Sequence, residues 1–516
     1  MKTTITLLLI ILSFAFTQAQ APAIQWQKQL GGSNIDFAQS IQQTSDGGYI
    51  VVGISNSADG DVTGHLGAAG SYDYWVAKLS ATGLLQWQKS FGGTNTDYAY
   101  SIQQTTDGGY ILAGESFSTN VDVTGNHGGG DYWVIKLSTT GTIEWQKALG
   151  GTGEDIARSI QQTADGGYIV AGSTTSTNGD VSATHVGADF WLVKLSSTGD
   201  LQWHKLYGRT ANDIAYCVQQ TTDGGYILAG QSTSTTGEYD YWIVKTDDFG
   251  ELQWQHKYGG TTNDIAYSID QTTDGGYIVA GQTLSNNGDV TGAHVSACCG
   301  VSEYWVVKLN ATGAIEWQKA LGGTEVETGR SIQQTADGGY IIAGNSFSSD
   351  GDITGVNHSS GDFWIVKLNN SGVLQWEKLI GGTGNDNPNS IHQTSDGGYI
   401  IGGESRSNNF DASGAGGHGS ADYWVVKLAP DALLTVPVFE KQKIVISPNP
   451  VCDVLQIQVP NNTTITEAKI IDITGKFVYE QSQNGNTINV ENLAQGMYIL
   501  EAYSGENKYV TKFVKE

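Results

Sequence analysis

Residues 164–174 read ADGGYIVAGST, and a closely similar stretch recurs along most of the chain. An Asp-Gly-Gly turn leads into a short run of β-branched and aromatic residues, which is the composition of a strand. Glycine takes positive φ without a Cβ penalty, so Asp-Gly-Gly between two such runs predicts a hairpin. The turn occurs seven times, 51–63 residues apart, beginning at Asp46, Asp107, Asp165, Asp223, Asp274, Asp337 and Asp396.

Each repeat contains four pieces with strand character. In the third repeat they are residues 157–163 (ARSIQQT), 164–174, 189–196 (DFWLVKLS) and 197–208 (STGDLQWHKLYG). No repeat shows an apolar pattern of helical period. Four antiparallel strands in each of seven repeats predict an all-β fold, a seven-bladed β-propeller over residues 24–428.

The tryptophans indicate how the two ends of the repeat region meet. The chain has 14 tryptophans, one on the third and one on the fourth strand of each repeat. The strand that holds Trp26 precedes the first repeat, whereas no fourth strand follows the strand of Trp424. We therefore expect Ile24–Leu30 to complete the last blade, so that an N-terminal strand closes the propeller. Burial of one indole contributes about 2–3 kcal/mol, so paired tryptophans should dominate the core.

The two ends of the chain differ from the repeats. Lys2, the apolar run 5–16 and the small-x-small sequence at 17–19 predict a signal peptide over residues 1–19. Residues 429–443 contain prolines and charges and predict a linker. Alternating apolar residues over 444–516 predict a small C-terminal β-sandwich of about seven strands.

Residues 444–516 resemble the type A sorting domain carried by cargo of the type IX secretion system of Bacteroidetes. The resemblance is carried by Ser447-Pro448-Asn449-Pro450, the D-x-x-G-K turn at 472–476, the L-x-x-G-x-Y strand at 493–498 and the Lys-Phe pair at 512–513. It implies signal-peptide export to the periplasm. The type IX machinery, as partner, would then carry the chain across the outer membrane for release or for attachment to the cell surface.

The repeats themselves are similar to tandem DGGYI-x-AG repeats of secreted bacterial proteins, and their layout resembles that of kelch-type propellers.

The composition of the whole chain narrows the range of possible functions. The 26 basic and 52 acidic residues give a formal net charge of −26, which repels phosphate backbones and anionic lipid. We therefore expect no nucleic-acid binding, and no apolar stretch is long enough for a transmembrane helix. Of the four cysteines, Cys217 replaces a core serine and Cys298-Cys299 lies in a loop.

The loop between the second and third strands is the candidate site, because it varies between repeats. It carries Asp-Val-Thr-Gly or a similar stretch and then a histidine, and the fourth repeat lacks it. Carboxylate, hydroxyl and carbonyl oxygens in Gly-rich loops suit a cation such as Ca²⁺, or a glycan, although Ca²⁺ takes 6–8 oxygens. The alternative is an Asx-turn with the histidine packed on a neighbouring blade. The candidate residues are Asp61 and His65, Asp122 and His127, Asp180 and His185, Asp289 and His294, Asp352 and His358, and Asp411 and His418.

Residues that recur in every blade are expected to be architectural. An acid stands at the start of each first strand, where we expect it to accept backbone N–H bonds in the turn after a Gly pair. Breaks in the symmetry instead suggest a pocket near the axis, where Asp270 and His392 replace a first-strand glutamine. The recurring acids are Asp36, Asp97, Asp155, Asp213, Asp264, Glu327 and Asp386.

The sequence contains no G-x-S-x-G elbow, H-E-x-x-H, Walker loop or EF-hand pattern. It favours a non-catalytic, secreted or cell-surface propeller that binds an extracellular polysaccharide or a surface protein. Two alternatives stay open. One is a hydrolase or lyase that acts on extracellular glycans, since a catalytic carboxylate pair is defined by its separation in space. The other is a structural envelope protein. Beyond calcium, no cofactor is indicated.

Overall fold

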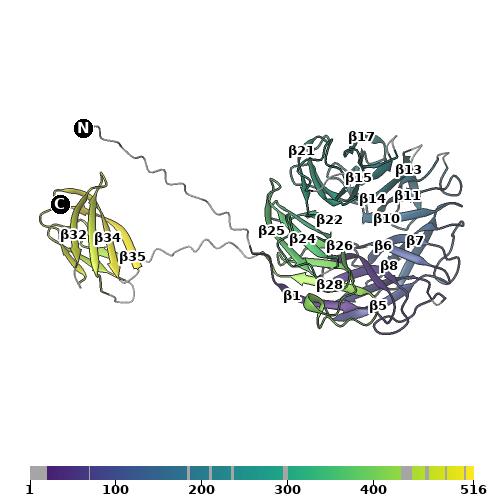
Figure 1. The fold of residues 1–516 in the computed structure, drawn as a ribbon, viewed down its shortest axis with the longest axis horizontal. Helices are drawn as coiled ribbons and strands as arrows, with labels where there is room; N and C mark the ends of the chain where they lie inside the picture. Colours follow the sequence, from purple (N-terminus) through teal and green to yellow (C-terminus); the bar gives the residue numbers. More distant parts are fainter. Residues whose placement is uncertain are drawn as a thin grey trace. The chain divides into compact units, whose positions relative to one another are not determined.

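The computed structural model describes residues 20–68, 70–182, 186–208, 212–233, 237–294, 300–358, 360–431, 444–459, 464–482, 485–504 and 507–516. The chain forms two compact units, residues 1–432 and 433–516 (Figure 1). Within the described ranges no helix is long and apolar enough to cross a membrane, and η1 (Phe410–Ala412) is a single 3-10 turn. The predicted signal peptide, 1–19, and residues 432–443 of the predicted linker lie outside the described residues.

In the residues that the structure describes, the first unit contains seven four-stranded antiparallel sheets, one for each repeat. We number them in chain order. They comprise β2 (Asp36–Gln43), β3 (Tyr49–Ser55), β4 (Asp73–Leu79) and β5 (Leu85–Phe91) in sheet 1; β6 (Asp97–Gln104), β7 (Tyr110–Ser116), β8 (Asp131–Leu137) and β9 (Ile143–Leu149) in sheet 2; β10 (Asp155–Gln162), β11 (Tyr168–Thr174), β12 (Asp189–Leu195) and β13 (Leu201–Tyr207) in sheet 3; and β14 (Asp213–Gln220), β15 (Tyr226–Thr233), β16 (Tyr239–Thr246) and β17 (Leu252–Tyr258) in sheet 4.

The remaining three sheets repeat this pattern, with one difference in the last. Sheet 7 takes its fourth strand from the start of the chain. The strands are β18 (Asp264–Gln271), β19 (Tyr277–Thr283), β20 (Glu303–Leu309) and β21 (Ile315–Leu321) in sheet 5; β22 (Glu327–Gln334), β23 (Tyr340–Ser346), β24 (Asp362–Leu368) and β25 (Leu374–Ile380) in sheet 6; and β26 (Asp386–Gln393), β27 (Tyr399–Ser405), β28 (Asp422–Leu428) and β1 (Ile24–Leu30) in sheet 7.

The Asp-Gly-Gly turn joins the first and second strands of each sheet. In sheet 1, Gly47 has a φ of +79°, and Asp46 Oδ1 accepts a hydrogen bond from Gly48 N at 2.9 Å. The buried Lys78 on the third strand places its Nζ 2.9 Å from Asp46 Oδ2. A hydrogen bond from Thr44, helped by Lys78, lowers the pKa of Asp46 to about 2. One aspartate therefore holds the hairpin and ties it to the third strand.

β1 pairs with β28 in antiparallel register, as expected for Ile24–Leu30 (Figure 1). Gln29 lies opposite Trp424, and Lys28 lies opposite Val425. The indole Nε1 of Trp424 donates to Gln27 Oε1 at 3.0 Å. The same indole-to-amide bond joins the third and fourth strands of sheet 1, so β1 occupies the position of an ordinary fourth strand.

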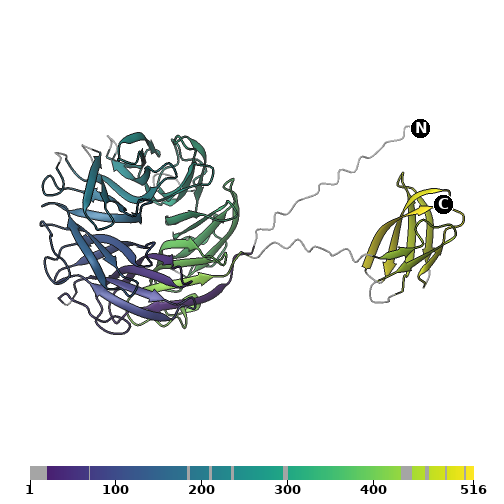
Figure 2. The ribbon, with the colours of Figure 1, turned by 180° about the vertical axis from the view of Figure 1, so that it is seen from behind.

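The sheets pack face to face around a common centre (Figures 1 and 2). Each first strand contacts the first strands of both neighbouring sheets, and β2 contacts β26 as well as β6. The Tyr74 ring lies 4.7 Å from the Trp133 ring, and its hydroxyl donates to Trp133 O at 3.1 Å. Tyr423 makes the same contact with Trp75, at 4.5 Å between rings and 2.9 Å for the hydrogen bond. Repeated four-stranded sheets in a propeller-like, all-β arrangement are thus confirmed.

The second unit consists of two packed sheets. Their buried side chains, among them Leu455, Ile470, Leu500 and Phe513, form one hydrophobic core. One sheet has the order β29 (Val445–Ser447), β30 (Val454–Gln458), β33 (Thr487–Asn489), and the other has the order β32 (Phe477–Ser482), β31 (Glu467–Asp472), β34 (Gly496–Ser504), β35 (Asn507–Lys515).

The contact between sheets 7 and 1 can be tested by removing one hydroxyl group. Tyr423→Phe keeps the ring on Trp75 but removes the hydrogen bond that the Tyr423 hydroxyl donates to the buried carbonyl oxygen of Trp75. We expect the free energy of unfolding to fall by about 1 kcal/mol. Chemical denaturation followed by tryptophan fluorescence measures the change.

Tyr74→Phe is the matched variant at the boundary of sheets 1 and 2. Phenylalanine fits this position, because Phe363 already packs on Trp424 in the same way, with 4.7 Å between the rings. The two variants should lose similar stability. A loss for Tyr74→Phe alone would show that sheet 7 does not rest on sheet 1 as the other sheets rest on their neighbours.

Candidate functional site

The loop aspartates bind to the glycine that follows the outer strand of the preceding sheet. In sheet 2, Asp122 N donates to Gly92 O at 3.1 Å, and Asp122 Oδ2 accepts from Gly92 N at 3.3 Å. The loop is therefore fixed across a sheet boundary by both its backbone and its side chain. The equivalent pairs are Asp61 with Gly31, Asp180 with Gly150, Asp289 with Gly259, Asp352 with Gly322, and Asp411 with Gly381.

The two residues after the aspartate anchor the loop to its own sheet. Val123 is fully buried. Thr124 accepts a hydrogen bond from Gln146 Nε2, and Gln146 Oε1 accepts from the indole of Trp133 at 2.9 Å. The loop is thereby joined through the fourth strand to the core tryptophan.

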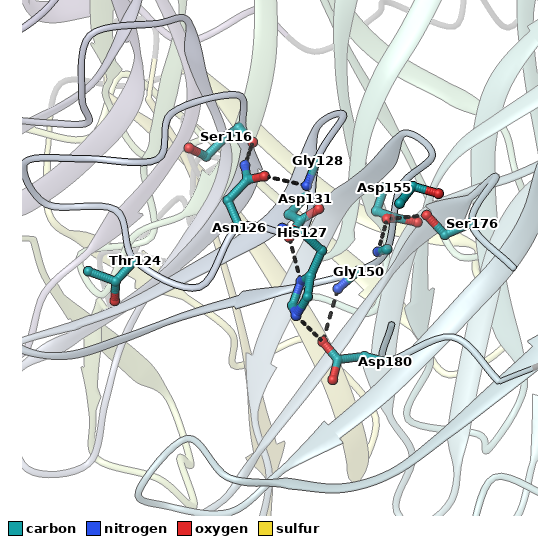
Figure 3. Close-up of polar contacts among 12 residues, drawn as sticks. Ser116, Thr124, Asn126, His127, Gly128, Asp131, Gly150, Asp155, Ser176 and Asp180 are labelled. Carbon is teal, nitrogen blue, oxygen red and sulfur yellow. Dashed lines mark hydrogen bonds and ion pairs between the residues drawn. The ribbon is translucent and has the colours of Figure 1, made fainter. Parts of the chain in front are cut away.

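The histidine of the loop lies between two acids that belong to different sheets (Figure 3). His127 Nδ1 is 2.9 Å from Asp131 Oδ2, at the start of the third strand of its own sheet. Its Nε2 is 4.0 Å from Asp180 Oδ2, on the loop of the next sheet. Asp180 in turn accepts from Gly150 N at 3.1 Å. The imidazole therefore links neighbouring loops through their carboxylates.

The structure brings some of the predicted residues together and leaves others apart. His294 Nε2 lies 3.6 Å from Asp352, and His418 Nδ1 lies 3.9 Å from Asp61, so both repeat the link made by His127. Among the described residues, His65 instead forms an ion pair with the acid of its own third strand, Asp73, at 2.9 Å. Within the described ranges no ion pair joins a predicted histidine to Asp122, Asp289 or Asp411. His185 lies outside the described residues.

His358 differs from the other loop histidines. Its ring stacks on Phe410 of the next sheet, with 4.1 Å between the ring centres, and its Nδ1 is 3.4 Å from Asp362. This contact is the kind expected if the loop is an Asx-turn with its histidine packed on a neighbouring blade, and not a cation or glycan site.

A second set of acids was not singled out by the sequence analysis. An acid is the first or second residue of every third strand, and at each boundary it faces the first-strand acid of the next sheet across a glycine. A Cβ on Gly92 would lie 2.5 Å from Asp97 Oδ2 and 2.7 Å from Asp73 Oδ1. The signal was present in the sequence as an acid before each Tyr-Trp or Phe-Trp. The pairs are Asp73–Asp97, Asp131–Asp155, Asp189–Asp213, Asp240–Asp264, Glu303–Glu327, Asp362–Asp386 and Asp422–Asp36.

The first-strand acids have the role that the sequence predicted. Asp36 Oδ2 accepts from Gly32 N at 2.8 Å and from Ser57 Oγ at 2.9 Å. The same N–H bond is formed by Asp97, Asp155, Asp264, Glu327 and Asp386. Burial raises the pKa of these carboxyls, because the charged form loses its water.

The geometry of these loops suits the joining of sheets. Their carboxylates already bind glycine N–H groups and imidazoles. In the part of the chain that the structure describes, no group of three or more His, Cys, Asp or Glu side chains is placed to hold a metal ion. Calcium binding by the loops stays a prediction.

The centre of the propeller-like unit contains a polar cavity of about 310 Å³. All seven first strands line it, mainly with serine and glutamine side chains, and Asp270 and His392 both reach it, as predicted for the axis. Asp270 accepts hydrogen bonds from Gln219 Nε2 at 2.8 Å and from Gln334 N at 2.9 Å. Burial lowers the pKa of His392 to about 4, so this imidazole is neutral at pH 7. Cys217 lines the same cavity, whereas Cys298 and Cys299 lie outside the described residues.

A second hollow lies where the fourth repeat lacks its loop. It has a volume of about 730 Å³ and is lined by β13 and β17, with Trp242 and Gln255 on its wall. In sheet 2 the residue equivalent to Gln255 is Gln146, which anchors the loop threonine. The missing loop therefore leaves polar and aromatic surface open that the other loops cover.

Comparison with known proteins identifies the second unit. Residues 445–516 match the family model of the secretion system C-terminal sorting domain. This confirms the sorting domain predicted from the sequence. A domain of this type indicates secretion through the type IX system, to the cell surface or the extracellular space.

The rest of the chain has more distant likenesses. The regulatory protein FlaEY of Caulobacter vibrioides is 24% identical over 263 residues, which are 46% of this chain and 27% of that protein. The WD40 domain of Neurospora crassa Pan2 is 9% identical, with a TM-score of 0.43 over 79% of this chain and 96% of that one. PorZ, a surface component of the type IX secretion system of Porphyromonas gingivalis, is 12% identical, with a TM-score of 0.30 over 91% and 69%. At such scores the fold description rests on the strand pairing and sheet contacts above.

The link between loops can be tested at His294. Burial favours its neutral form, but the hydrogen bond to Glu303 and the charge of Asp352 together raise its pKa. Asp352→Asn removes one of these charges, so we expect the pKa of His294 to fall, as measured by NMR titration of the imidazole protons. Asp289→Asn is the control, since Asp289 lies on the same loop but binds Gly259. An unchanged pKa in Asp352→Asn would contradict the link.

The buried carboxyls make the stability of the first unit depend on pH. Burial raises the pKa of Asp73, Asp131, Asp264 and Asp362 from 3.8 to about 6. Their contribution to stability is complete below pH 3.8 and is lost as the pH rises through about 6. The turn carboxyl of Asp46, with a pKa of about 2, contributes above pH 3.8 and loses its effect only as the pH falls through about 2. We expect the thermal midpoint to be highest near about pH 4 and to fall as the pH rises toward 7.

Calorimetry across this range checks the expectation. Asp131→Asn cannot ionise at one boundary, so its midpoint should fall less between pH 5 and pH 7 than that of the unaltered chain. Identical pH profiles for both proteins would show that the paired acids do not set the dependence.

Proposed function

We propose that the protein is a secreted or surface-attached seven-bladed β-propeller, closed by its N-terminal strand, that binds an extracellular polysaccharide without catalysing a reaction. Export would begin with the signal peptide at residues 1–19 and the periplasm, and end through the type IX machinery with residues 444–516. The observation that carries the export step is the match of residues 445–516 to the sorting domain.

Three contacts support a closed ring of seven blades. β1 pairs with β28, β2 contacts both β26 and β6, and Tyr423 of sheet 7 binds Trp75 O of sheet 1. A further hydrogen bond runs from Ser395 N in sheet 7 to Gln43 Oε1 in sheet 1, at 2.8 Å. The same bond joins sheets 1 and 2, from Ser45 N to Gln104 Oε1 at 2.7 Å.

A binding role is supported by how the polar residues are used. The loop acids and histidines hold neighbouring sheets together, so they act as framework for a rigid ring. The central cavity is lined with amide, hydroxyl, carboxyl and imidazole groups, which are the groups that bind sugar hydroxyls. A rigid frame around a polar centre suits recognition of a hydroxyl-rich ligand.

One observation favours the enzyme alternative, a glycan-active hydrolase or lyase. Glu115 is 3% exposed and lies with Glu154 and Tyr98 beside a hollow of about 710 Å³. Burial and the charge of Glu154 raise the pKa of Glu115 to about 8. A carboxyl that keeps its proton at neutral pH is what a general acid requires.

The full chain, purified and applied to an array of bacterial and plant polysaccharides, distinguishes these proposals. We expect binding to a subset of glycans that is unchanged by calcium or EDTA, because the loop carboxylates are already bonded within the protein. Release of shorter sugars from a bound glycan, lost in Glu115→Gln, would instead establish the hydrolase or lyase. Absence of binding to every glycan would overturn the polysaccharide proposal.

A further inference from the structure

The fourth residue of every first strand forms a β-bulge. In sheet 3 the register shifts between Ala157 and Ser159, which leaves Arg158 unpaired, and the same shift occurs in every first strand. A bulge turns the side chain of its extra residue away from the ladder. Because the first strands lie side by side around the centre, the bulge residues form a ring, named here the bulge ring. Its members are Gln39, Tyr100, Arg158, Tyr216, Tyr267, Arg330 and Asn389.

Five members of the bulge ring contact one another in an unbroken series. The guanidinium of Arg158 lies 4.2 Å from the centre of the Tyr100 ring and 5.9 Å from that of Tyr216. Tyr216 and Tyr267 lie 5.0 Å apart, and the guanidinium of Arg330 lies 4.4 Å from Tyr267. Two cations and three aromatic rings thus form one series across five consecutive sheets.

This series concentrates positive charge on an acidic protein. The chain has a formal net charge of −26 and only four arginines, two of which are in the bulge ring. Neither Arg158 nor Arg330 forms an ion pair within the described residues. Arg158 Nε is buried without a hydrogen-bond partner there, whereas Arg330 is exposed. Arg330 is therefore accessible to a ligand, whereas Arg158 is half-buried.

Two acids whose pKa is raised by burial interact with the charges of these arginines. The charge of Arg158 favours the ionised form of the buried Glu115. Burial nevertheless raises the pKa of Glu115 to about 8, so this carboxyl is mostly uncharged at pH 7. Glu404 feels the charge of Arg330, but burial raises its pKa too, and its Oε1 accepts from Asn387 Nδ2 at 2.6 Å. The two arginines meet a ligand as full positive charges.

We propose that the bulge ring binds an acidic polysaccharide through a uronic-acid residue, whose carboxylate pairs with Arg158 or Arg330 and whose sugar ring packs on the neighbouring tyrosines. This rests on the polysaccharide binding proposed above, and it adds the class of sugar and the residues that recognise it. A guanidinium presents paired N–H donors in a plane, which matches a planar carboxylate. The guanidinium of the exposed Arg330 lies over the Tyr267 ring, 4.4 Å from its centre.

The test measures binding of the purified full chain to three oligosaccharides by calorimetry: oligogalacturonate, its methyl ester and a neutral glucan. The ester keeps the sugar ring and removes the charge. We expect tight binding to oligogalacturonate only, weakened by added salt. Arg158→Gln and Arg330→Gln should each weaken it by about tenfold, and the double variant should abolish it. Arg158→Lys keeps the charge but loses the planar fork, so it should bind with intermediate affinity.

Lys319→Gln is the matched control, since it removes one positive charge from an exposed position on β21. It should bind as the unaltered chain does, and thermal melting should show that every variant is folded. Equal binding by the Arg→Gln variants and the unaltered chain overturns the proposed site. Dextran sulfate, measured in the same way, is a sugar polymer whose charges are sulfates and not carboxylates. Equal affinity for dextran sulfate and oligogalacturonate overturns the uronic-acid assignment.

Two further outcomes separate this inference from the proposed function. Binding of the neutral glucan or the methyl ester as tightly as the acid removes the charge requirement while polysaccharide binding stands. Failure of all three sugars, together with failure on the glycan array, removes both.

Discussion

The contact between the aromatic residue of one third strand and the tryptophan of the next is the interaction on which the first unit depends. A four-stranded sheet with both faces apolar is unstable alone, so each must be covered by its neighbours. Tyr74 contacts the next sheet in two ways: its ring packs against Trp133, and its hydroxyl donates a hydrogen bond to the Trp133 carbonyl oxygen. The hydroxyl places a directional bond inside an otherwise non-directional apolar interface. The ring contact itself does not require this bond, because Phe363 packs on Trp424 in the same way without a hydroxyl.

Near the loops, the sheet boundaries are polar instead. Two acids flank a glycine at each boundary, all of them buried except the half-buried Asp240. Where the loop is present, its aspartate lies beside them. Burying two carboxyls together is unfavourable when both are charged. Burial raises the pKa of Asp131 to about 6, so below that pH its carboxyl is protonated and can share a small space with its neighbour. The loop residues that resemble a metal site in sequence are in this way part of the same seam.

The repeat made the strands and their pairing predictable. Asp-Gly-Gly defines one hairpin, and an unmatched tryptophan strand at each end indicates that β1 joins β28. The acid before each Tyr-Trp or Phe-Trp was visible in the sequence, but its partner lies on the next sheet, so the pair appears only in space. Arg158 and Tyr216 were unremarked for a similar reason. They are 58 residues apart and meet because a bulge in each strand turns them toward one centre. Periodicity predicts elements well, whereas sites made by several repeats depend on how those elements pack.

The sharing of sheet 7 between the two ends of the repeat region affects how the protein folds. Gln27 and Trp424, bonded in that sheet, are 397 positions apart along the chain. During synthesis β1 is the first strand made, and its partner strand, β28, is the last strand of the first unit to be made. The backbone groups of β1 and the side chain of Trp26 therefore lack their partners while the other six sheets form. Contacts this distant in sequence slow folding and leave a strand edge open to wrong pairing. Sheet 7 can therefore be completed only after both β1 and β28 have been translated.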